Sequence, residues 1–547
     1  MKRQSSVLFA WLLLALAACT AANVPSALLP NARTQARHPE PNATLGGVVN
    51  EETFSVPAGK AFTVRENLYV FASKSATVDG ALIVYPGVTV AFITPSFTLG
   101  KTALLRWETF PAAGNAPSPM PNVVSACNVF VAGDAQWIPG GGVNLELSAS
   151  GKPPEGQHCL VVFQSGVKLA LEHGLNGSHY ADGNGGNGGS IEIGSTKAIE
   201  DADAIAKAHG HSDISASRPD TLNLGISLIA APGGTGKSVS KVPARKGTTY
   251  SVIAGTGGKG GKIDVTVGKI VGNDVRVQAG SGGDGGYVYE ERIGWKLDGT
   301  ASSPDASDIE VTMGAGGEGG DISVTTKKPK PKSFVETPGD GGNASTLVLD
   351  GVEGQFAAGA GYSVLSKTPL TTGHGGSATI NLALGGERGT NGKKGQIPSI
   401  EFFGGTGGNT PPAYLYGVAP GTLVKGGDGG SLTLVLPKGS NAKDVVKTWG
   451  LKVTIGGFGS GGSSWLAPVQ GGFCPTPPPA GVDGGNAGAW HDNGLFEAMY
   501  PNGGTAWGAG FAGGNGSAGT PPGNGGTGGK TDGGFALGAA GAQGKQC

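Results

Sequence analysis

The sequence predicts an all-β fold: a parallel β-helix, or solenoid, with glycine-rich elbows, one short helical insertion and a glycine-rich C-terminal cap. Glycine supplies 104 of 547 residues, far above the usual ~7%. Glycine pairs recur between short strands, and those that begin at residues 233, 260 and 285 lie 27 and 25 residues apart. A period of roughly 20–50 residues is typical of stacked repeats, in which each unit buries its apolar face against its neighbours.

The segment 263–267 shows the strand pattern most clearly. Ile263, Val265 and Val267 occupy every second position, so they face one side of an extended chain. We expect glycine between such strands because a sharp corner needs backbone angles that are costly for a residue with a Cβ atom, and because stacked corners bring backbones close together. The same alternation predicts inward rows at Ile322 and Val324, Leu347 and Leu349, Ile380, Leu382 and Leu384, Leu432, Leu434 and Leu436, and Leu451, Val453 and Ile455.

The first residues predict export. Residues 1–18 combine Lys2 and Arg3 with an apolar run that is too short to span a bilayer, which is the pattern of a secretory signal peptide. Its end, Leu16-Ala17-Ala18-Cys19, looks like the lipobox of bacterial lipoproteins. This likeness implies that Cys19 is the lipidated first residue of the mature protein.

An ordinary secretory signal, cut after Ala18 or Ala22, is the alternative interpretation. Thr20 follows the cysteine where an aspartate would indicate retention at an inner membrane. The expected location is therefore the bacterial cell envelope, lipid-anchored and facing outward, on the outer membrane if the cell has one. Residues 19–45 hold prolines among small and polar residues and predict a flexible tether.

The rest of the chain divides into three parts. Residues 46–175 are rich in branched and aromatic residues and form either the first coils or a separate β-rich cap, residues 176–456 form the glycine-elbow solenoid, and residues 457–547 form a glycine- and proline-rich cap and tail. An alanine-rich stretch from Ser195 or Thr196 to Gly210 predicts a helix of about three turns. We expect this helix to be an insertion that covers an open edge.

The cysteines that remain after Cys19 are Cys127, Cys159, Cys474 and Cys547. An even number in an exported chain indicates two disulfides, and the sequence allows three pairings. Cys127–Cys159 with Cys474–Cys547 is favoured because each pair would close one end of a stack. Reduced cysteines or pairing with another molecule are the alternatives.

Composition and motifs argue against several binding functions. The formal net charge of −1 lacks the basic excess that nucleic-acid binding needs. The segment 231–238 resembles a phosphate-binding loop, but Val239 to Pro243 does not continue as a helix, so no nucleotide is expected. The double-glycine elbows are similar to calcium-binding solenoids, yet their central residue is Asn187, Lys259, Asp284, Glu318, Asp428 or Phe458. A lysine or phenylalanine cannot ligate calcium, and no cofactor is predicted.

One histidine-containing cluster and two acidic groups have residue types that could form a metal or catalytic site, but no site is predicted at any of them. His209, His211 and Asp213 follow the helix, with His173 and His179 earlier, and a loop could gather them around a metal. Histidines at a helix end more often contact its last carbonyls, so no metal site is predicted. The acidic groups near strand ends lack the spacing of a catalytic pair, and no catalytic residue is predicted; these groups are Glu200, Asp201 and Asp203, and Glu290, Glu291 and Asp298.

Between Gly185 and Leu436, Gly-Gly-x-Gly-Gly followed by an alternating strand recurs. In this pattern the chain resembles bacterial surface β-helix proteins of the filamentous haemagglutinin kind, and more loosely glycine-rich mycobacterial surface repeats. The resemblance implies a structural or ligand-binding envelope lipoprotein, a surface scaffold or adhesion-type module. Its expected contacts are the membrane through the lipid anchor and an envelope glycan or another surface protein. The alternative is a β-helix polysaccharide lyase or glycoside hydrolase, although the chain is not expected to be an enzyme.

Overall fold

The computed structural model divides into two compact units, residues 1–40 and 41–547. The first unit, which includes Cys19, lies outside the described residues, so the description concerns the second. The structure describes residues 43–108, 121–150, 158–240, 250–272, 274–286, 288–291, 309–312, 314–329, 333–337, 340, 347–350, 374, 377–382, 399–402, 406–407, 426–435, 443, 452–455, 481, 483–492, 494, 498, 512–517, 520–534, 536 and 538–546.

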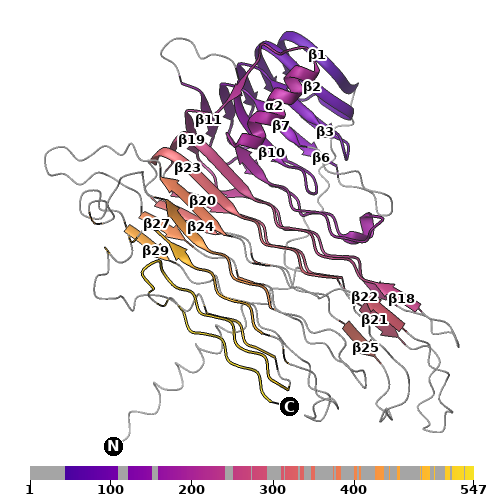
Figure 1. The fold of residues 1–547 in the computed structure, drawn as a ribbon. Helices are drawn as coiled ribbons and strands as arrows, with labels where there is room; N and C mark the ends of the chain where they lie inside the picture. The colour runs from indigo at the N-terminus through magenta and orange to yellow at the C-terminus, as the bar shows by residue number, and fades with distance from the viewer. Residues whose placement is uncertain are drawn as a thin grey trace, which may run out of the picture. The chain divides into compact units, whose positions relative to one another are not determined.

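The chain begins with two long parallel strands, β1 (Ala43–Val56) and β2 (Ala61–Val78) (Figure 1). Three shorter strands then pair with the start, middle and end of β2: β3 (Ala81–Val84), β4 (Val90–Ile93) and β5 (Ser96–Leu99). Each coil therefore carries three consecutive strands that stack in parallel on those of the coil before. The predicted all-β parallel β-helix is confirmed.

The three stacks of strands are called the first, second and third columns. The first column is β3, β6 (Leu104–Trp107), β9 (Gln136–Ile138) and β12 (Lys168–Leu169). The second is β4, β7 (Asn122–Ser125), β10 (Leu145–Ser150), β13 (Ile191–Ile193), β19 (Ile263–Val271), β23 (Ile322–Pro329), β26 (Ala378–Leu382), β28 (Leu432–Val435) and β30 (Trp490–His491). The third is β5, β8 (Asn128–Val131), β11 (Leu160–Phe163), β15 (Thr221–Leu224) and the end of β19.

Further strands follow the third column. One parallel sheet contains β16 (Leu228–Ile229), β20 (Asp274–Gln278), β24 (Ser333–Thr337), β27 (Ser399–Phe402) and β29 (Lys452–Ile455). Two smaller parallel sheets contain β17 (Val239–Ser240), β21 (Val288–Glu291) and β25 (Leu347–Asp350), and β18 (Tyr250–Ile253) with β22 (Ile309–Thr312). The antiparallel pair among the described strands is β10 with β14 (Ala216–Ser217).

The described residues between 46 and 175 form the first coils of this same sheet. Their strands β10 and β11 pair directly with β13 and β15, which in turn pair with β19. The described residues after 480 also continue the stack, since β30 pairs with β28. In the described part, both ends of the chain therefore extend one solenoid.

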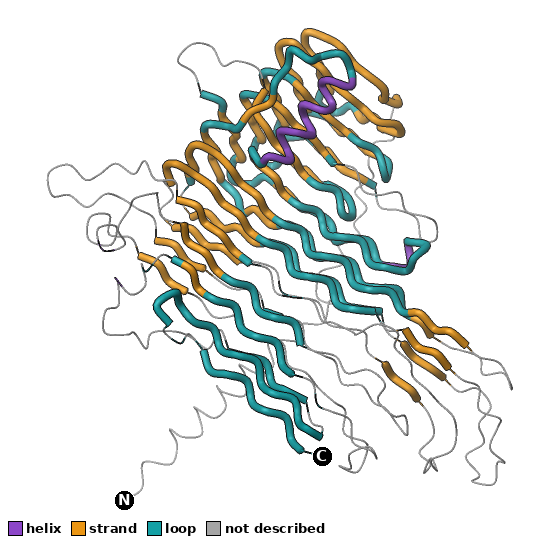
Figure 2. The backbone as a smooth tube through the Cα atoms, in the orientation of Figure 1, coloured by secondary structure: helices purple, strands orange, loops and turns teal. Residues whose placement is uncertain are grey.

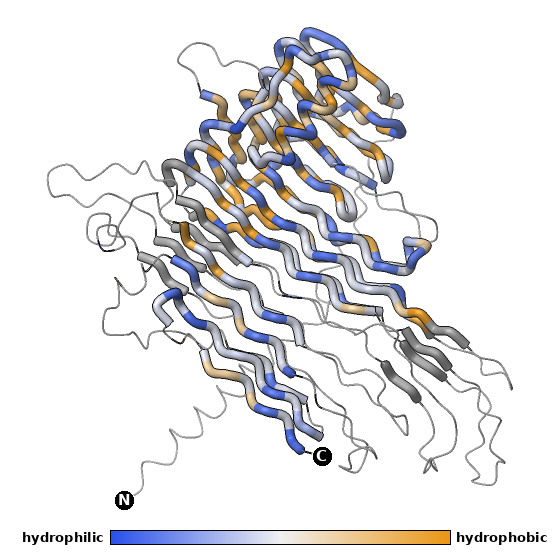
Figure 3. Tube along the Cα trace, viewed as in Figure 1, coloured by the Kyte–Doolittle hydropathy of each residue, from blue (hydrophilic) through white to orange (hydrophobic). Residues whose placement is uncertain are grey.

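Inward rows of apolar side chains form one continuous core. Ile263, Val265 and Val267 are buried as predicted, and so are the predicted rows on β23 and β28. Aromatic rings fill the early coils, where Phe92 and Phe97 lie 4.9 Å apart between ring centroids. Orange apolar segments concentrate there in Figure 3, and the later glycine segments are paler. The predicted rows at Leu347 and Leu349, Ile380, Leu382 and Leu384, and Leu451, Val453 and Ile455, and the position of Leu436, fall on residues whose side chains or placement lie outside the described part.

The glycine-rich stretches are straight segments that lead into strands, drawn as teal lengths side by side in Figure 2. In the segment 255–262, every third residue, at positions 256, 259 and 262, is other than glycine. An adjacent glycine-rich segment of the same chain bonds to these positions. The N–H groups of Gly185 and Gly188 donate to the carbonyls of Thr256 and Lys259 at 2.7 and 2.8 Å. A period of three residues identifies the segments as polyproline II helices, which have three residues per turn.

The side chain at the third position also has a fixed structural task. Asn187 Oδ1 accepts the N–H of Lys259 at 3.0 Å, and Asp428 Oδ1 accepts the N–H of Asn486 at 2.7 Å. Ser190 Oγ does the same for Lys262 at 3.0 Å. Asn, Asp and Ser thus satisfy a backbone donor on the next segment that no strand ladder reaches.

Close packing between two layers explains the glycines. The N–H of Gly258 donates to the carbonyl of Gly234 at 2.8 Å, and the N–H of Gly234 donates to that of Gly186 at 2.8 Å, across antiparallel segments. A Cβ atom on Gly258 would lie 2.0 Å from the Gly186 carbonyl oxygen. Gly258 has no left-handed φ, so backbone proximity requires glycine here and a sharp corner does not. Of the two reasons that the sequence suggested, close approach is the one that applies.

Candidate ligand-binding site

Helix α2 (Thr196–Ala208) lies across the outer face of the second column (Figure 1). Ser195 Oγ accepts the Ala198 N–H at 3.1 Å and so caps the helix as predicted. The helix covers a sheet face, however, and not the open edge that the sequence suggested. Small side chains permit this close packing, because the buried residues of the helix are Ala198, Ala202 and Ala206.

The end of the helix reverses the chain toward the sheet. The N–H of Gly210 donates to the Lys207 carbonyl at 3.2 Å and that of His211 to the Ala206 carbonyl at 2.9 Å, which is the Schellman arrangement. It needs a left-handed residue, and Gly210 has φ +86°. The turn places the His211 ring on Phe71 of β2, with ring centroids 4.0 Å apart and planes 20° from parallel.

The loop that follows is fixed at its far end too. Asp203 Oδ1 on the helix accepts the Ala216 N–H at 2.6 Å. Ala216 and Ser217 form β14, which pairs with the end of β10. The loop 211–215 is therefore held at both ends and forms a wall beside the strands.

A pocket of about 890 Å³ lies between this loop and the strands β1, β2 and β4. Its volume is within the ~300–1,000 Å³ of small-molecule sites. The lining residues come from five separate stretches of the chain, which is why no local motif predicts the pocket: they are Asn50, Glu51, Glu52, Phe71, Ala72, Ser73, Ile93, Thr94, Pro95, Ser150, His211, Asp213, Ile214, Ser215 and Ser217.

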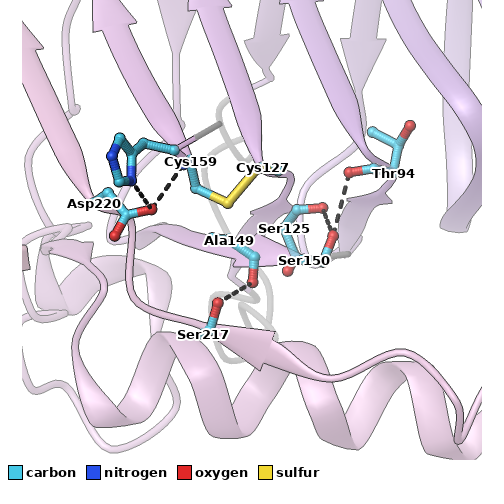
Figure 4. Close-up of a disulfide and its surroundings, with 9 residues drawn as sticks. Thr94, Ser125, Cys127, Ala149, Ser150, Cys159, Ser217 and Asp220 are labelled. Atoms are coloured by element: carbon cyan, nitrogen blue, oxygen red, sulfur yellow. Dashed lines mark hydrogen bonds and ion pairs between the residues drawn. A yellow bond between two sulfur atoms is a disulfide. The ribbon is translucent and has the colours of Figure 1, made fainter. Parts of the chain in front are cut away.

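Hydrogen bonds hold the floor of the pocket beside a disulfide (Figure 4). Ser150 Oγ donates to the Ser125 carbonyl at 2.6 Å and contacts the Thr94 carbonyl at 3.2 Å. Two residues after Ser125, Cys127 is bonded to Cys159, the first of the two predicted disulfides. This bond joins the stretches that lead into β8 and β11, so it ties two adjacent coils together beside the pocket floor.

A second cluster lies under the first turn of α2. Glu146, Glu192 and Asp264 are in register on the neighbouring strands β10, β13 and β19, and their side chains lie on the outer face because the apolar neighbours point inward. Glu146 and Glu192 are 0% exposed. Sequence reasoning missed this carboxylate ladder, defined as these three residues.

Two lysines and the helix cap compensate the ladder. Lys197 forms an ion pair with Glu146 and, at 2.8 Å, with Asp201. Lys262 Nζ lies 3.0 Å from Glu192 Oε1, and the cap Ser195 donates its hydroxyl to Glu192 Oε2 at 2.7 Å. The ladder thereby anchors the N-terminal end of the helix whose other end forms the pocket wall.

Burial raises the pKa of Glu146 and of Asp264. Loss of hydration raises the pKa of Glu146 from 4.5 to about 7, with the Asp201 carboxylate adding to the rise and Lys197 opposing it. Burial, and then the charge of Glu192, also raise the pKa of Asp264. For Glu146 the difference corresponds to about 3 kcal/mol. A raised carboxyl pKa means that the folded state holds the proton more tightly, so stability falls as pH rises through the interval from 4.5 to about 7.

We expect Glu146→Gln to remove most of this fall. The wild-type free energy of unfolding should drop by up to about 3 kcal/mol between pH 4.5 and 7.5, whereas the amide cannot ionise, so the variant should show a flatter profile. Urea unfolding at pH 4.5, 6 and 7.5 measures both. The pKa of Asp201 is lowered, so its ionisation affects stability only below this pH interval.

The matched control is Glu200→Gln, which changes an exposed carboxylate on helix α2, the helix that covers Glu146. Its profile should follow that of the wild type. Parallel profiles for the wild type and Glu146→Gln would contradict the assignment of the ladder as the source of the pH dependence.

The structure separates the other candidate residues of the sequence. His211 and Asp213 line the pocket, and His209 lies against Tyr69 with ring centroids 4.3 Å apart. His179 lies on a separate one-turn 3-10 helix, η2 (Gly177–His179). Within the described ranges, no three or more His, Cys, Asp and Glu side chains are placed to hold a metal ion.

Asp201 and Asp203 are engaged by Lys197 and Ala216, and Glu200 is exposed. Glu290 and Glu291 are on β21, their side chains lie outside the described part, and Asp298, Cys474 and Cys547 are also outside it. The phosphate-loop-like stretch 231–238 is a glycine segment followed by strand β17. Its Gly236 N–H donates to the Asp284 carbonyl at 2.9 Å and so is not free to hold a phosphate.

No protein-family model, curated protein or solved structure matches this chain. Among the residues that the structure describes, no helix has both the length and the apolar character to cross a membrane. The fold is that of an all-β protein with a parallel β-helix. The pocket and the sequence are the features that bear on its function.

Proposed function

We propose that this protein is a ligand-binding lipoprotein of the bacterial cell envelope, in which the solenoid carries a small-molecule pocket. The observation that carries the binding role is the pocket of about 890 Å³ beside α2. Apolar and aromatic side chains with a few polar groups are the usual lining of such sites, and Phe71, Ile93 and Asp213 supply both kinds here. The lipobox-like Leu16-Ala17-Ala18-Cys19 supports the location.

The rigidity of the surroundings supports binding. The pocket floor belongs to β-strands, the wall is fixed by the Schellman turn and by Asp203, and a disulfide joins the coils below. Preorganised sites lose less entropy when a ligand binds. An envelope glycan fragment is the ligand class that the expected location favours, and contact with another surface protein is the other role.

The alternative is a β-helix polysaccharide lyase or glycoside hydrolase. Its support is Glu146, because a carboxyl pKa of about 7 suits a general acid. Glu146 is 0% exposed, lies beneath α2 and does not line the pocket, so a substrate bond in the pocket would not reach it. Binding without turnover is therefore the better supported function.

Envelope and plant polysaccharides test the two roles together. Purified mature protein should retain at least one of them on an affinity column or gel and leave all of them uncut, as shown by assays for reducing ends and unsaturated sugars. Cleavage that disappears in Glu146→Gln, Glu290→Ala, Glu291→Ala or Asp298→Ala would favour the enzyme instead. Failure to retain any glycan would remove the glycan-binding role.

Lipid attachment is tested separately. We expect labelled palmitate to enter the wild-type protein during expression in a bacterial host and Cys19→Ser to abolish the label, because the thiol is the site of attachment. The variant should also move from the membrane fraction to the soluble one, since stable anchoring needs the acyl chains. Cys127→Ser is the control for cysteine loss, and an equally labelled, membrane-bound Cys19→Ser protein would disprove the anchor.

A further inference from the structure

The carboxylates that line the pocket are hydrogen-bond acceptors. Among its described lining residues there are three carboxylates, Glu51, Glu52 and Asp213, and no lysine or arginine. Lys74 pairs with Glu52 at 2.6 Å outside the lining, and both side chains are exposed. Within the described part of the chain, no basic side chain forms an ion pair with Glu51 or Asp213.

Two of the five hydroxyl groups in the lining add acceptors. Thr94 Oγ1 donates its proton to the Ser96 carbonyl at 3.3 Å, and Ser150 Oγ donates to the Ser125 carbonyl at 2.6 Å. Both residues are nearly buried, at 3% and 2% exposed. A hydroxyl whose proton is already bonded can offer only its lone pairs, so these side chains present acceptors at the pocket floor.

The His211 imidazole also presents an acceptor to the pocket. His211 Nε2 lies 2.9 Å from Asn50 Oδ1, and the amide oxygen can only accept, so Nε2 carries the hydrogen. In the neutral ring the remaining nitrogen, Nδ1, is then an acceptor. The ring face of His211 is stacked on Phe71, which makes this wall flat and apolar.

From these contacts we infer that the pocket takes a cationic ligand, a primary amine carried on a compact hydroxylated ring, as in an amino sugar. An ammonium group supplies three donors and a positive charge to the carboxylates of Glu51 and Asp213. Anionic ligands such as uronates and phosphates meet carboxylates without a counter-charge and are disfavoured. The inference rests on the proposed function, because it names the ligand class of the same pocket.

A charged disaccharide and two uncharged analogues, of which cellobiose has nearly the same size, test the charge. Isothermal titration of the full mature protein at pH 7 and low salt should show the glucosamine disaccharide binding at least tenfold more tightly than its N,N′-diacetyl form and than cellobiose. Raising sodium chloride from 50 to 500 mM should weaken binding of the amine most, since the distance over which exposed charges interact falls from about 14 Å to about 4 Å between these concentrations. A digalacturonate probe should not bind.

Asp213→Asn and Glu51→Gln supply the residue-level test. Both positions are exposed, so the folds should survive, and each variant should lose about tenfold in affinity for the amine while binding cellobiose as before. Glu200→Gln, which removes an exposed carboxylate outside the pocket, should leave all affinities unchanged.

These measurements distinguish failure of the cationic ligand from failure of the proposed ligand-binding function. Equal binding of the amine and its acetylated form, or preference for digalacturonate, overturns the cationic ligand and leaves a ligand-binding pocket in place. Amine binding that Asp213→Asn and Glu51→Gln do not weaken also overturns it. If none of the four probes binds, the cationic inference fails, and the polysaccharide panel decides the proposed function independently.

Discussion

Gly258→Ala should destabilise the protein by several kcal/mol, beyond the roughly 1–3 kcal/mol that is typical of overpacking. The added Cβ would lie 2.0 Å from the Gly186 carbonyl oxygen and 2.5 Å from its carbon. Neither atom belongs to a flexible side chain, so two hydrogen-bonded segments would have to separate. Substitution of glycine in the collagen triple helix has the same physical origin, since only glycine fits where polyproline II chains crowd together.

Two control variants make the measurement specific. Lys259→Ala changes the adjacent outward residue and removes an exposed ion pair with Glu318, which should cost less than about 1 kcal/mol. Gly59→Ala lies at φ +76° with nothing within 4 Å of the new Cβ, so it isolates the backbone cost of about 1–2 kcal/mol. Urea unfolding of all four proteins gives the order, and a Gly258→Ala protein no weaker than Gly59→Ala would show that the layers are not in close contact.

The three-residue period of the glycine-rich segments is visible in the sequence, but the prediction of sharp corners at the glycine pairs does not use it. Between Gly255 and Lys262, positions 256, 259 and 262 are the non-glycine positions. That spacing is three, which neither a strand nor an α-helix has. Because the flanking strands are period two, the change of period marks where β-structure gives way to polyproline II.

The carboxylate ladder could also have been anticipated, but its burial could not. The strands Leu145-Glu146-Leu147, Ile191-Glu192-Ile193 and Ile263-Asp264-Val265 share one pattern, and stacking in register brings their acidic residues together. Outward positions on a β-helix normally meet water. Only the docking of α2 on that face, which depends on three small alanines, turns Glu146 into a buried acid.

The pocket was beyond sequence reasoning for a different reason. The sequence places His211 and Asp213 just after the helix. In the structure they line one pocket with Asn50, Phe71 and Ser150. These contacts require the register of several coils and the Schellman turn at Gly210 at once. Sequence patterns fix periods and directions along a strand, whereas a pocket depends on how distant segments are placed against each other.

Val265→Lys is expected to have an effect as large as that of Gly258→Ala, by a different mechanism. Val265 is 1% exposed and lies in register between Ile193 and Val324 on the neighbouring strands. A lysine there would bury an ammonium group with no partner in an apolar row, which costs several kcal/mol even if the group loses its proton. We expect the variant to be largely unfolded at 37 °C, as measured by circular dichroism and by susceptibility to protease.

Thr266→Lys is the matched comparison, because it places the same charge one residue further along β19. Thr266 is half-buried on the outer face, two residues from the carboxylate of Asp264, so the added lysine can reach water and meet an opposite charge. Its free energy of unfolding should stay within about 1 kcal/mol of the wild type. Since a shift of register by one residue would exchange the two faces, equal damage from both substitutions, or greater damage at Thr266, would show that β19 does not have the register on which the core and the carboxylate ladder depend.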